Sequence, residues 1–237
     1  MAKNVILSVV FPVLNQADHI NRVISSYHKS LSKLNIRFEL ITVVNGSSDN
    51  SIEICNSLAK KIDNLRVYEI KEKGYGLGIL YGMDKAEGKY LCYLNSARVY
   101  EDELVKCVRI FLTKPGLLLQ AIRVKRDVYY RRLSSVIYNF FCCLIFGIRS
   151  PDINGSPKIF SRENYHLLNL KFTDSMIDLE LLEKAKEQGL KVLEVPIYKN
   201  KRHGGISTSN YNTILRLIRE VIRYFILTRL SKRAYSL

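Results

Sequence analysis

Strand and helix patterns alternate along the first 95 residues of the chain. Residues 5–11 form a nearly continuous apolar run, as expected of a strand that is covered on both faces, and three further strands are expected at 38–44, 65–70 and 90–94. Apolar residues at helical spacing fill the intervals, at 17–34, at 52–62 and at 79–86, after a glycine-rich turn. Pro12 is expected to end the first strand. The alternation predicts one α/β domain with a mostly parallel central sheet and helices on both faces.

The second half of the chain has a different pattern. Residues 136–148 form an aromatic and strongly apolar run, and residues 177–188 have the spacing of an amphipathic helix that Gly189 closes. The remaining segments are a loop at 152–157, a strand at 192–197, a basic loop at 200–209 and a long basic helix at 211–235. We expect the main domain to cover residues 1–208 and a membrane-associated basic helix to cover residues 209–237.

Polar loops follow three of the expected strands, at 12–18, 45–49 and 95–98. Ligands of open parallel sheets bind outside the carboxyl ends of the strands, where these loops meet. The topology alone therefore predicts a ligand site that is built from the three loops.

The charge of the chain points to an anionic partner. The formal net charge is +15, from 37 Lys and Arg against 22 Asp and Glu. The C-terminal segment combines an apolar face, which includes Ile218, Ile222 and Phe225, with flanking arginines, as an interfacial helix on a membrane does. The alternative is a basic helix packed on its own domain. Nucleic acid is the weaker partner, because the basic residues cluster with bulky aliphatic rather than stacking aromatic side chains.

Composition and length also indicate the cellular setting. The five cysteines show no metal-ligand spacing and are expected to be reduced thiols in the cytoplasm. The apolar run at 5–13 lacks a small-residue cleavage site, so no signal peptide is expected. The longest apolar run, 136–148, is well short of the ~20 residues that span a bilayer. We therefore expect a cytoplasmic protein that lies peripherally on the inner face of a membrane.

Seven motifs, in order, resemble those of family 2 glycosyltransferases. They cover about residues 5–208, and the block at 152–160 (DINGSPKIF) is similar to that of polyprenyl-phosphate glycosyltransferases, including dolichyl-phosphate mannose synthases. The others are 8–16 (SVVFPVLNQ), 43–51 (VVNGSSDNS), the glycines from Gly74 to Gly88, 178–182 (DLELL), 194–197 (EVPI), and Arg202 with Gly205 and Ser207. The resemblance implies a GT-A fold, a nucleotide-sugar donor and a polyprenyl-phosphate or membrane-bound glycan acceptor.

The resemblance also implies a set of donor-binding residues. Backbone amides at strand ends and in glycine turns hold phosphate, and asparagine side chains hydrogen-bond a base or a ribose. The implied nucleotide-sugar ligands are Pro12, Asn15, Gln16, Asn45, Ser47, Gly74, Gly76, Asn95, Ser96 and Arg123. Two interpretations of the asparagines stay open, since Asn15 and Asn45 are also ordinary loop-capping residues. Asp49 is expected to cap the helix that follows it.

The chain departs from the family where the family holds its metal. Relatives carry an Asp-x-Asp motif after the fourth strand, whereas residues 95–98 read NSAR. Mg²⁺ and Mn²⁺ prefer charged oxygen ligands, and Asn95 and Ala97, at the two acidic positions, supply none. No metal ligand is therefore assigned, and Mg²⁺ or Mn²⁺ remains only a family expectation. Arg98 is a candidate cation for the leaving diphosphate, or alternatively a solvent-facing loop residue.

The catalytic and acceptor residues follow from the later motifs. We assign Asp178, Arg98 and Arg202 to catalysis and Asp152 and Lys158 to the acceptor or its phosphate, with surface cations as the alternative interpretation of the basic ones. Asp178 and Glu180 are two residues apart on a helix, so only one of them is expected to face the site. An inverting transfer needs a general base unless the acceptor is already a phosphate anion. The lost carboxylates leave a second class open, that of a catalytically inactive binding or scaffold protein.

Overall fold

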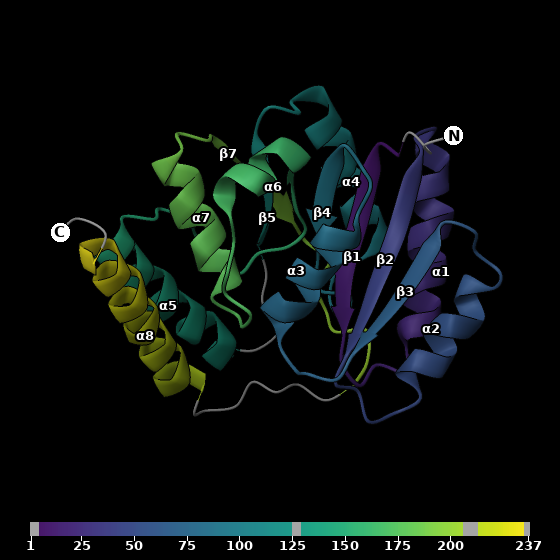
Figure 1. The fold of residues 1–237 in the computed structure, drawn as a ribbon, viewed down its shortest axis with the longest axis horizontal. Helices are drawn as coiled ribbons and strands as arrows, with labels where there is room; N and C mark the ends of the chain where they lie inside the picture. Colours follow the sequence, from purple (N-terminus) through teal and green to yellow (C-terminus); the bar gives the residue numbers. More distant parts are fainter. Residues whose placement is uncertain (1–4, 125–128, 206–212, 235–237) are drawn as a thin grey trace.

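The protein, described by a computed structural model over residues 5–124, 129–205 and 213–234, is built on a seven-stranded sheet (Figure 1). The strand order is β3-β2-β1-β4-β6-β5-β7. The strands are β1 (Leu7–Val13), β2 (Phe38–Asn45), β3 (Leu65–Ile70), β4 (Tyr90–Tyr93), β5 (Leu118–Arg123), β6 (Lys158–Ser161) and β7 (Val192–Ile197). The helices are α1 (Ile20–Leu31), η1 (Ser32–Leu34), α2 (Ser51–Ala59), α3 (Tyr75–Lys85), α4 (Glu101–Thr113), α5 (Tyr129–Phe146), α6 (Arg162–Leu168), α7 (Ile177–Glu187) and α8 (Thr213–Ala234).

The order of the strands reverses beside β1. Strand β1 pairs in parallel with β2 on one side and with β4 on the other. Strand β6 is antiparallel to both of its neighbours, β4 and β5, and β7 is parallel to β5. The mostly parallel α/β architecture is therefore confirmed. The reversal places the loops after β1 and β4 side by side at the carboxyl edge, which is where ligands of such sheets bind.

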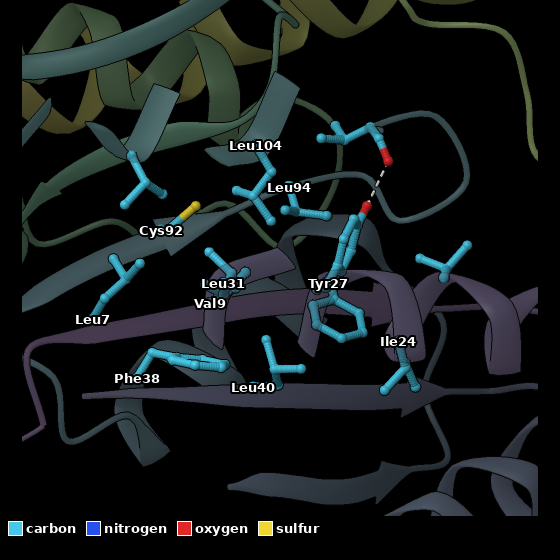
Figure 2. Packing of buried hydrophobic residues seen from close by; sticks show 14 of the residues in the cluster. Leu7, Val9, Ile24, Tyr27, Leu31, Phe38, Leu40, Cys92, Leu94 and Leu104 are labelled. Carbon is cyan, nitrogen blue, oxygen red and sulfur yellow. Dashed lines mark hydrogen bonds between the residues drawn. The ribbon is translucent and has the colours of Figure 1, made fainter. Parts of the chain in front are cut away.

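Two apolar clusters cover the two faces of the sheet. Alternate residues of β1 point to opposite faces, so Val9 joins the cluster with α1, α2 and α4, and Val10 joins the one with α3 and α5–α8. Figure 2 shows part of the first cluster, with Tyr27 and Ile24 of α1 in the same group as Val9 of β1 and Leu40 of β2. The apolar positions expected to give the first helix its inner face are all buried. The coverage of both faces therefore explains why β1 reads as a nearly continuous apolar run.

Several boundaries differ from the sequence expectation. Strand β1 continues through Pro12 to Val13, because beyond Val10 it pairs only with β2, and the missing proline N–H costs little on that one-sided ladder. Helix α3 begins at Tyr75 rather than at residue 79, with two glycines of the expected turn inside it. Strands β5 and β6 were not predicted. The acidic residues from Glu101 lie in the first turn of α4, where negative charge suits the helix dipole.

The C-terminal helix packs on the main body of the protein. Val221 and Tyr224 of α8 belong to the second apolar cluster, and α8 lies beside α5 (Figure 1). The domain boundary expected at 208/209 falls in residues 206–212, outside the described part of the chain, as does Ser207. Across the described ranges, no helix combines the length and apolar character that crossing a membrane requires.

Close packing of α3 on the sheet generates a stability prediction. A Cβ atom on Gly82 would lie 2.3 Å from Val10 Cγ1 and 3.1 Å from Val43 Cγ2. Gly82→Ala should therefore lower the free energy of unfolding by about 1–3 kcal/mol, since the strands cannot move aside without cost. Urea denaturation followed by circular dichroism measures it. Gly116→Ala is the control, because a Cβ there meets nothing within 4 Å. Equal stability of the two variants would contradict the packing argument.

Candidate active site

The loops after β1 and β2 are joined by side-chain hydrogen bonds. Asn15 adopts a left-handed conformation, with φ of 51°, which asparagine tolerates better than most residues. Its Oδ1 accepts from the backbone N–H of Ser48 at 2.8 Å, and its own N–H donates to Ser47 Oγ at 3.1 Å. Asn15 is exposed. In this structure Asn15 and Ser47 therefore bridge the two loops, while the Asn15 side chain still borders solvent.

Asp49 forms the second bridge between these loops. Its carboxylate accepts from Ala17 N–H at 2.9 Å, from Ser51 N–H at 3.1 Å and from Ser51 Oγ at 2.6 Å. Burial would raise the pKa of Asp49, but the hydrogen bonds from Ser51 and Ala17 outweigh it and lower the pKa from its usual value. Asp49 thus binds Ser51, the first helical residue of α2, although the N-cap position itself is occupied by Asn50, and it also holds the neighbouring loop.

Asn45 and the glycines before α3 are closely packed. Asn45 is 2% exposed, and its Nδ2 donates to the carbonyl of Gly74 at 2.8 Å. Among the described residues its Oδ1 has no hydrogen-bond partner. A Cβ on Gly76 would lie 2.4 Å from the carbonyl oxygen of Phe172, and one on Gly74 would lie 2.7 Å from that of Thr173. In this structure Gly74 and Gly76 therefore permit backbone packing, which differs from the phosphate contact expected of them.

The loop after β4 is held by neutral hydrogen bonds. Ser96 is fully buried, and its hydroxyl donates to Gln16 Oε1 at 2.9 Å and lies 3.3 Å from the carbonyl of Pro12. Asn95 Oδ1 accepts from Ala97 N–H at 3.1 Å. Gln16 itself is 6% exposed. Gln16, Asn95 and Ser96 were expected to contact the nucleotide-sugar. In this structure their side chains instead make hydrogen bonds within and between the loops after β1 and β4.

These residues do not fit a divalent cation. Ala97 has no ligand atom, the Ser96 hydroxyl points into the protein, and the Asn95 oxygen closes a turn. Among the described residues, no group of three or more His, Cys, Asp or Glu side chains lies close enough to hold a metal. Charged oxygens are what Mg²⁺ and Mn²⁺ prefer. The geometry supplies cations at this loop instead of carboxylates.

A basic loop at 199–205 docks on the loop after β4. His203 N–H donates to the carbonyl of Ala97 at 2.9 Å, and His203 Nε2 lies 2.9 Å from the carbonyl of Val99, which also accepts from Tyr27 OH at 2.7 Å (Figure 2). A carbonyl only accepts, so Nε2 carries the hydrogen. Burial, together with the nearby charges of His19 and Arg22, lowers the pKa of His203 despite that bond. Burial of the docking imidazole therefore favours its neutral form.

Two of the expected catalytic cations belong to this assembly. Arg98 is partly buried and its Nη1 donates to the carbonyl of Asn200 at 3.2 Å, so it is not a purely solvent-facing residue. Arg202 donates from Nε to the carbonyl of Gly204 at 2.6 Å. Arg202 also lines a cleft of about 300 Å³ between α1, the start of α4 and the basic loop. The fold thus joins Arg98 to the loop that carries Arg202.

A second cluster of charged residues lies inside the protein, behind the loop at 152–157. Lys158 is fully buried, and its ammonium group donates to Asp178 Oδ1 at 2.6 Å and to the carbonyls of Ile153 and Gly155 at 2.9 and 2.7 Å. Burial lowers the pKa of Lys158, and Asp178 opposes that effect. The three ammonium hydrogens are all used. The phosphate contact expected of Lys158 is therefore not available in this structure.

Arg123 and Asp152 form the other ion pair of this cluster. Arg123 Nη2 and Nε lie 2.6 and 2.7 Å from the two Asp152 oxygens, and Arg123 also donates to the carbonyl of Asn154 at 3.3 Å. Burial alone would lower the pKa of Arg123, but the Asp152 carboxylate more than offsets it and raises that pKa. In this structure Arg123 and Asp152 thus shape the 152–157 loop rather than reaching outward as a free phosphate ligand and an acceptor contact.

Helix α7 separates its two acidic side chains. Asp178 accepts from Lys158 and from Tyr93 OH, which lies 2.8 Å away. Glu180 instead accepts from the N–H groups of Lys171 and Phe172 and pairs with Lys184. The side chains of Asp178 and Glu180 therefore point in different directions, as their spacing predicts, although both residues are buried. The sequence did not identify Tyr93 and His203 as site residues. The only indications were that Tyr93 lies near the end of an expected strand and that His203 lies in the basic loop.

The buried pair predicts non-additive effects on stability. Lys158→Met or Asp178→Asn alone should cost about 3–5 kcal/mol, because each leaves part of a charge network unpaired in the interior. The double variant should lose at least ~1 kcal/mol less than the sum of the single losses. Urea denaturation by circular dichroism suits the chain, which has no Trp. Additive losses would show that the two groups do not stabilise each other.

Comparison with known proteins places this geometry in context. The chain is 22% identical to a low-salt glycan biosynthesis hexosyltransferase of Haloferax volcanii over 86% of its length, and 24% identical to an undecaprenyl-phosphate 4-deoxy-4-formamido-L-arabinose transferase of Proteus mirabilis over 77%. It spans 50% and 61% of the lengths of those two relatives.

Solved structures show the same architecture. Glucosyl-3-phosphoglycerate synthase from Mycobacterium tuberculosis, in a complex with Mn²⁺, uridine diphosphate and phosphoglyceric acid, superposes with a TM-score of 0.74 at 19% identity, covering 94% of this chain and 78% of that one. The likeness establishes the GT-A type of fold. The family model of glycosyl transferase family 2 matches residues 8–168. With its ordered motifs, its GT-A sheet and this match, the chain belongs to glycosyl transferase family 2.

Proposed function

We propose that the protein transfers a sugar from a nucleotide-sugar to a lipid-linked acceptor, a polyprenyl phosphate or a membrane-bound glycan, without a divalent cation at the loop after β4. Family membership supports the reaction class. One observation supports a reaction without a metal: the loop after β4 has neutral residues where the family has carboxylates. Beside this loop, Arg98 donates a hydrogen bond to the loop that contains Arg202.

The donor side of the proposal rests on the loops at the carboxyl edge of β1, β2 and β4. Asn15 and Ser47 border solvent where a nucleoside would lie, and Asn45 Oδ1 is a buried acceptor with no partner among the described residues. An unpaired buried oxygen is costly and gains from a donor such as a ribose hydroxyl. Because Asn45 is only 2% exposed, its side chain would have to shift slightly to reach a bound ribose.

The leaving diphosphate needs positive charge in the transition state. Guanidinium groups hold phosphate oxygens in bidentate geometry and need no metal. Arg98 and Arg202 come from two loops that contact each other, and we assign both to the same diphosphate. Their assigned role is to stabilise the charge that develops as the sugar–diphosphate bond breaks.

The acceptor side favours a nucleophile that is already an anion. Asp178 is 3% exposed, and the two described hydrogen bonds to its carboxylate both fall on Oδ1. A buried, ion-paired carboxylate is poorly placed to remove a proton from an approaching hydroxyl. A phosphate oxygen needs no such base. The undecaprenyl-phosphate substrate in the name of one relative is consistent with that choice.

The proposed reaction is a single inverting displacement. An oxygen of the acceptor phosphate attacks the anomeric carbon from the side opposite to the diphosphate and forms the new C–O bond. The bond from that carbon to the diphosphate breaks, and its electron pair leaves with the diphosphate oxygen. Asp178 then acts as a positioning residue: it holds Lys158, which holds the carbonyls of the 152–157 loop.

A lipid-linked acceptor implies a position at a membrane surface, and we place it on the cytoplasmic, inner face. The net charge of +15 supports attraction to anionic lipid. The competing proposal of an inactive scaffold is motivated by the lost carboxylates. It predicts a folded protein that turns over no donor but stays in a complex with another glycosyltransferase subunit.

The donor prediction is tested by calorimetric titration with UDP, GDP and TDP and with their sugars. At least one nucleotide should bind, and its affinity should not change with EDTA or with added Mn²⁺, because no described group holds the metal. Replacing Arg98 with Ala should weaken the diphosphate but not the corresponding nucleoside. Absence of binding by every nucleotide, with and without Mn²⁺, would reject the donor proposal.

The catalytic prediction concerns turnover. Arg98→Ala should lower kcat about 100-fold or more, as loss of one preorganised donor to transition-state charge does. Arg98→Lys should retain part of the rate, because the charge remains. The exposed Arg109 on α4 gives the matched control, and Arg109→Ala should turn over normally. Release of nucleoside diphosphate reports the rate. Turnover that resists both Arg98→Ala and EDTA would leave the metal-free mechanism without its cation.

A further inference from the structure

The outward side of α5 is apolar. Six described side chains of this helix are exposed: Arg132, Leu133, Val136, Phe140, Cys143 and Leu144. Only the first is charged. The exposed fractions of Phe140 and Leu144 are 63% and 71%. A helix that faces water normally carries polar residues on this side, so α5 has the outer surface of a helix with a partner.

The outward side of α8 combines apolar and basic residues. Ile222, Phe225, Ile226 and Leu227 are 40–49% exposed. The exposed Arg223 lies between Ile222 and Phe225 along the helix, and the exposed Arg219 lies one turn before Ile222 and Arg223. Bulky apolar side chains with interspersed cations are typical of helices that lie in the interface of an anionic membrane.

The two helices form one surface. Each buries its other side in the second apolar cluster, through Tyr138 and Cys142 of α5 and through Val221 and Tyr224 of α8. The rings of Phe146 and Tyr224 meet at 5.3 Å, and the helices run side by side at one flank of the molecule (Figure 1). Eight of the thirteen exposed large hydrophobic side chains of the described residues lie on this pair.

We propose that this α5–α8 face, the exposed side chains of the two helices, lies on an anionic lipid bilayer. The bilayer accepts the apolar side chains, and its acidic headgroups complement Arg132, Arg219 and Arg223. A second copy of the chain fits less well, because symmetric contact through this face would bring the arginines of two strongly cationic molecules together.

The α5–α8 face is directly connected to the candidate site. Asn139 of α5 donates from Nδ2 to the carbonyl of Pro151, and its Oδ1 lies 3.4 Å from Ile153 N–H. The loop at 152–157 is therefore bonded to the helix that meets the lipid. This part of the inference rests on the proposed function: a docked α5 holds that loop where a lipid-linked phosphate emerges from the bilayer.

Vesicle binding of the full chain tests the proposal. The wild type should float with vesicles of about 70% phosphatidylcholine and 30% phosphatidylglycerol, and bind less to pure phosphatidylcholine or at high salt. Phe140→Gln with Leu144→Gln should reduce partitioning by about tenfold or more, since two exposed apolar side chains are lost. Leu167→Gln is the matched control: Leu167 is 61% exposed but lies on α6. It should bind as the wild type does.

Two further measurements separate the possible failures. Calorimetry with nucleotide in the absence of vesicles reports the donor site alone. A wild type that binds nucleotide but no vesicle, or a double variant that floats like the wild type, overturns the membrane face and leaves the proposed function standing. A wild type that binds vesicles but no nucleotide overturns the proposed function and leaves the membrane face standing. A dimer in sedimentation that Phe140→Gln with Leu144→Gln dissociates would make the face a subunit interface instead.

Discussion

The buried ammonium group of Lys158 is the interaction on which the second half of the molecule depends. It leaves the start of β6 and meets α7 through Asp178, the 152–157 loop through two carbonyls, and Tyr93 of β4 through their shared carboxylate. An isolated charge in such a place would be prohibitive, so every ammonium hydrogen must find an acceptor. The network therefore permits one arrangement of these segments and disfavours others.

Strand β6 is antiparallel for a related reason. It follows the 152–157 loop, which the Arg123–Asp152 pair holds at the carboxyl end of β5. Leaving that end, the chain must run back through the sheet between β4 and β5. A parallel sheet with this one reversed strand brings a loop from the second half of the chain beside the loop after β4, where Asn95 N–H lies 3.4 Å from Ser156 Oγ.

The loop after β4 shows how the fold persists without its carboxylates. Gln16 and Ser96 join neighbouring loops by a neutral hydrogen bond, and the docked histidine supports the loop from the other side. Two aspartates at this place without a metal would repel each other. Neutral residues therefore keep this edge of the sheet stable without a metal and leave Arg98 beside it. This is the structural basis for proposing a reaction that needs no metal.

The sequence by itself determined the class of fold, the buried faces of the early helices and the order of the loops at the sheet edge. Periodicity records which side of an element is apolar, and a strand such as β1, which is covered on both faces, is apolar along nearly its whole length. It did not reveal β5 and β6, whose short runs also fit loops. Tertiary structure alone decided that Lys158 and Arg123 point inward, since their partners are 20 and 29 residues away. Tertiary structure alone also decided which sides of α5 and α8 remain exposed. Both sides of these helices carry apolar residues, so the sequence pattern does not distinguish the side that packs on the domain from the side that faces outward.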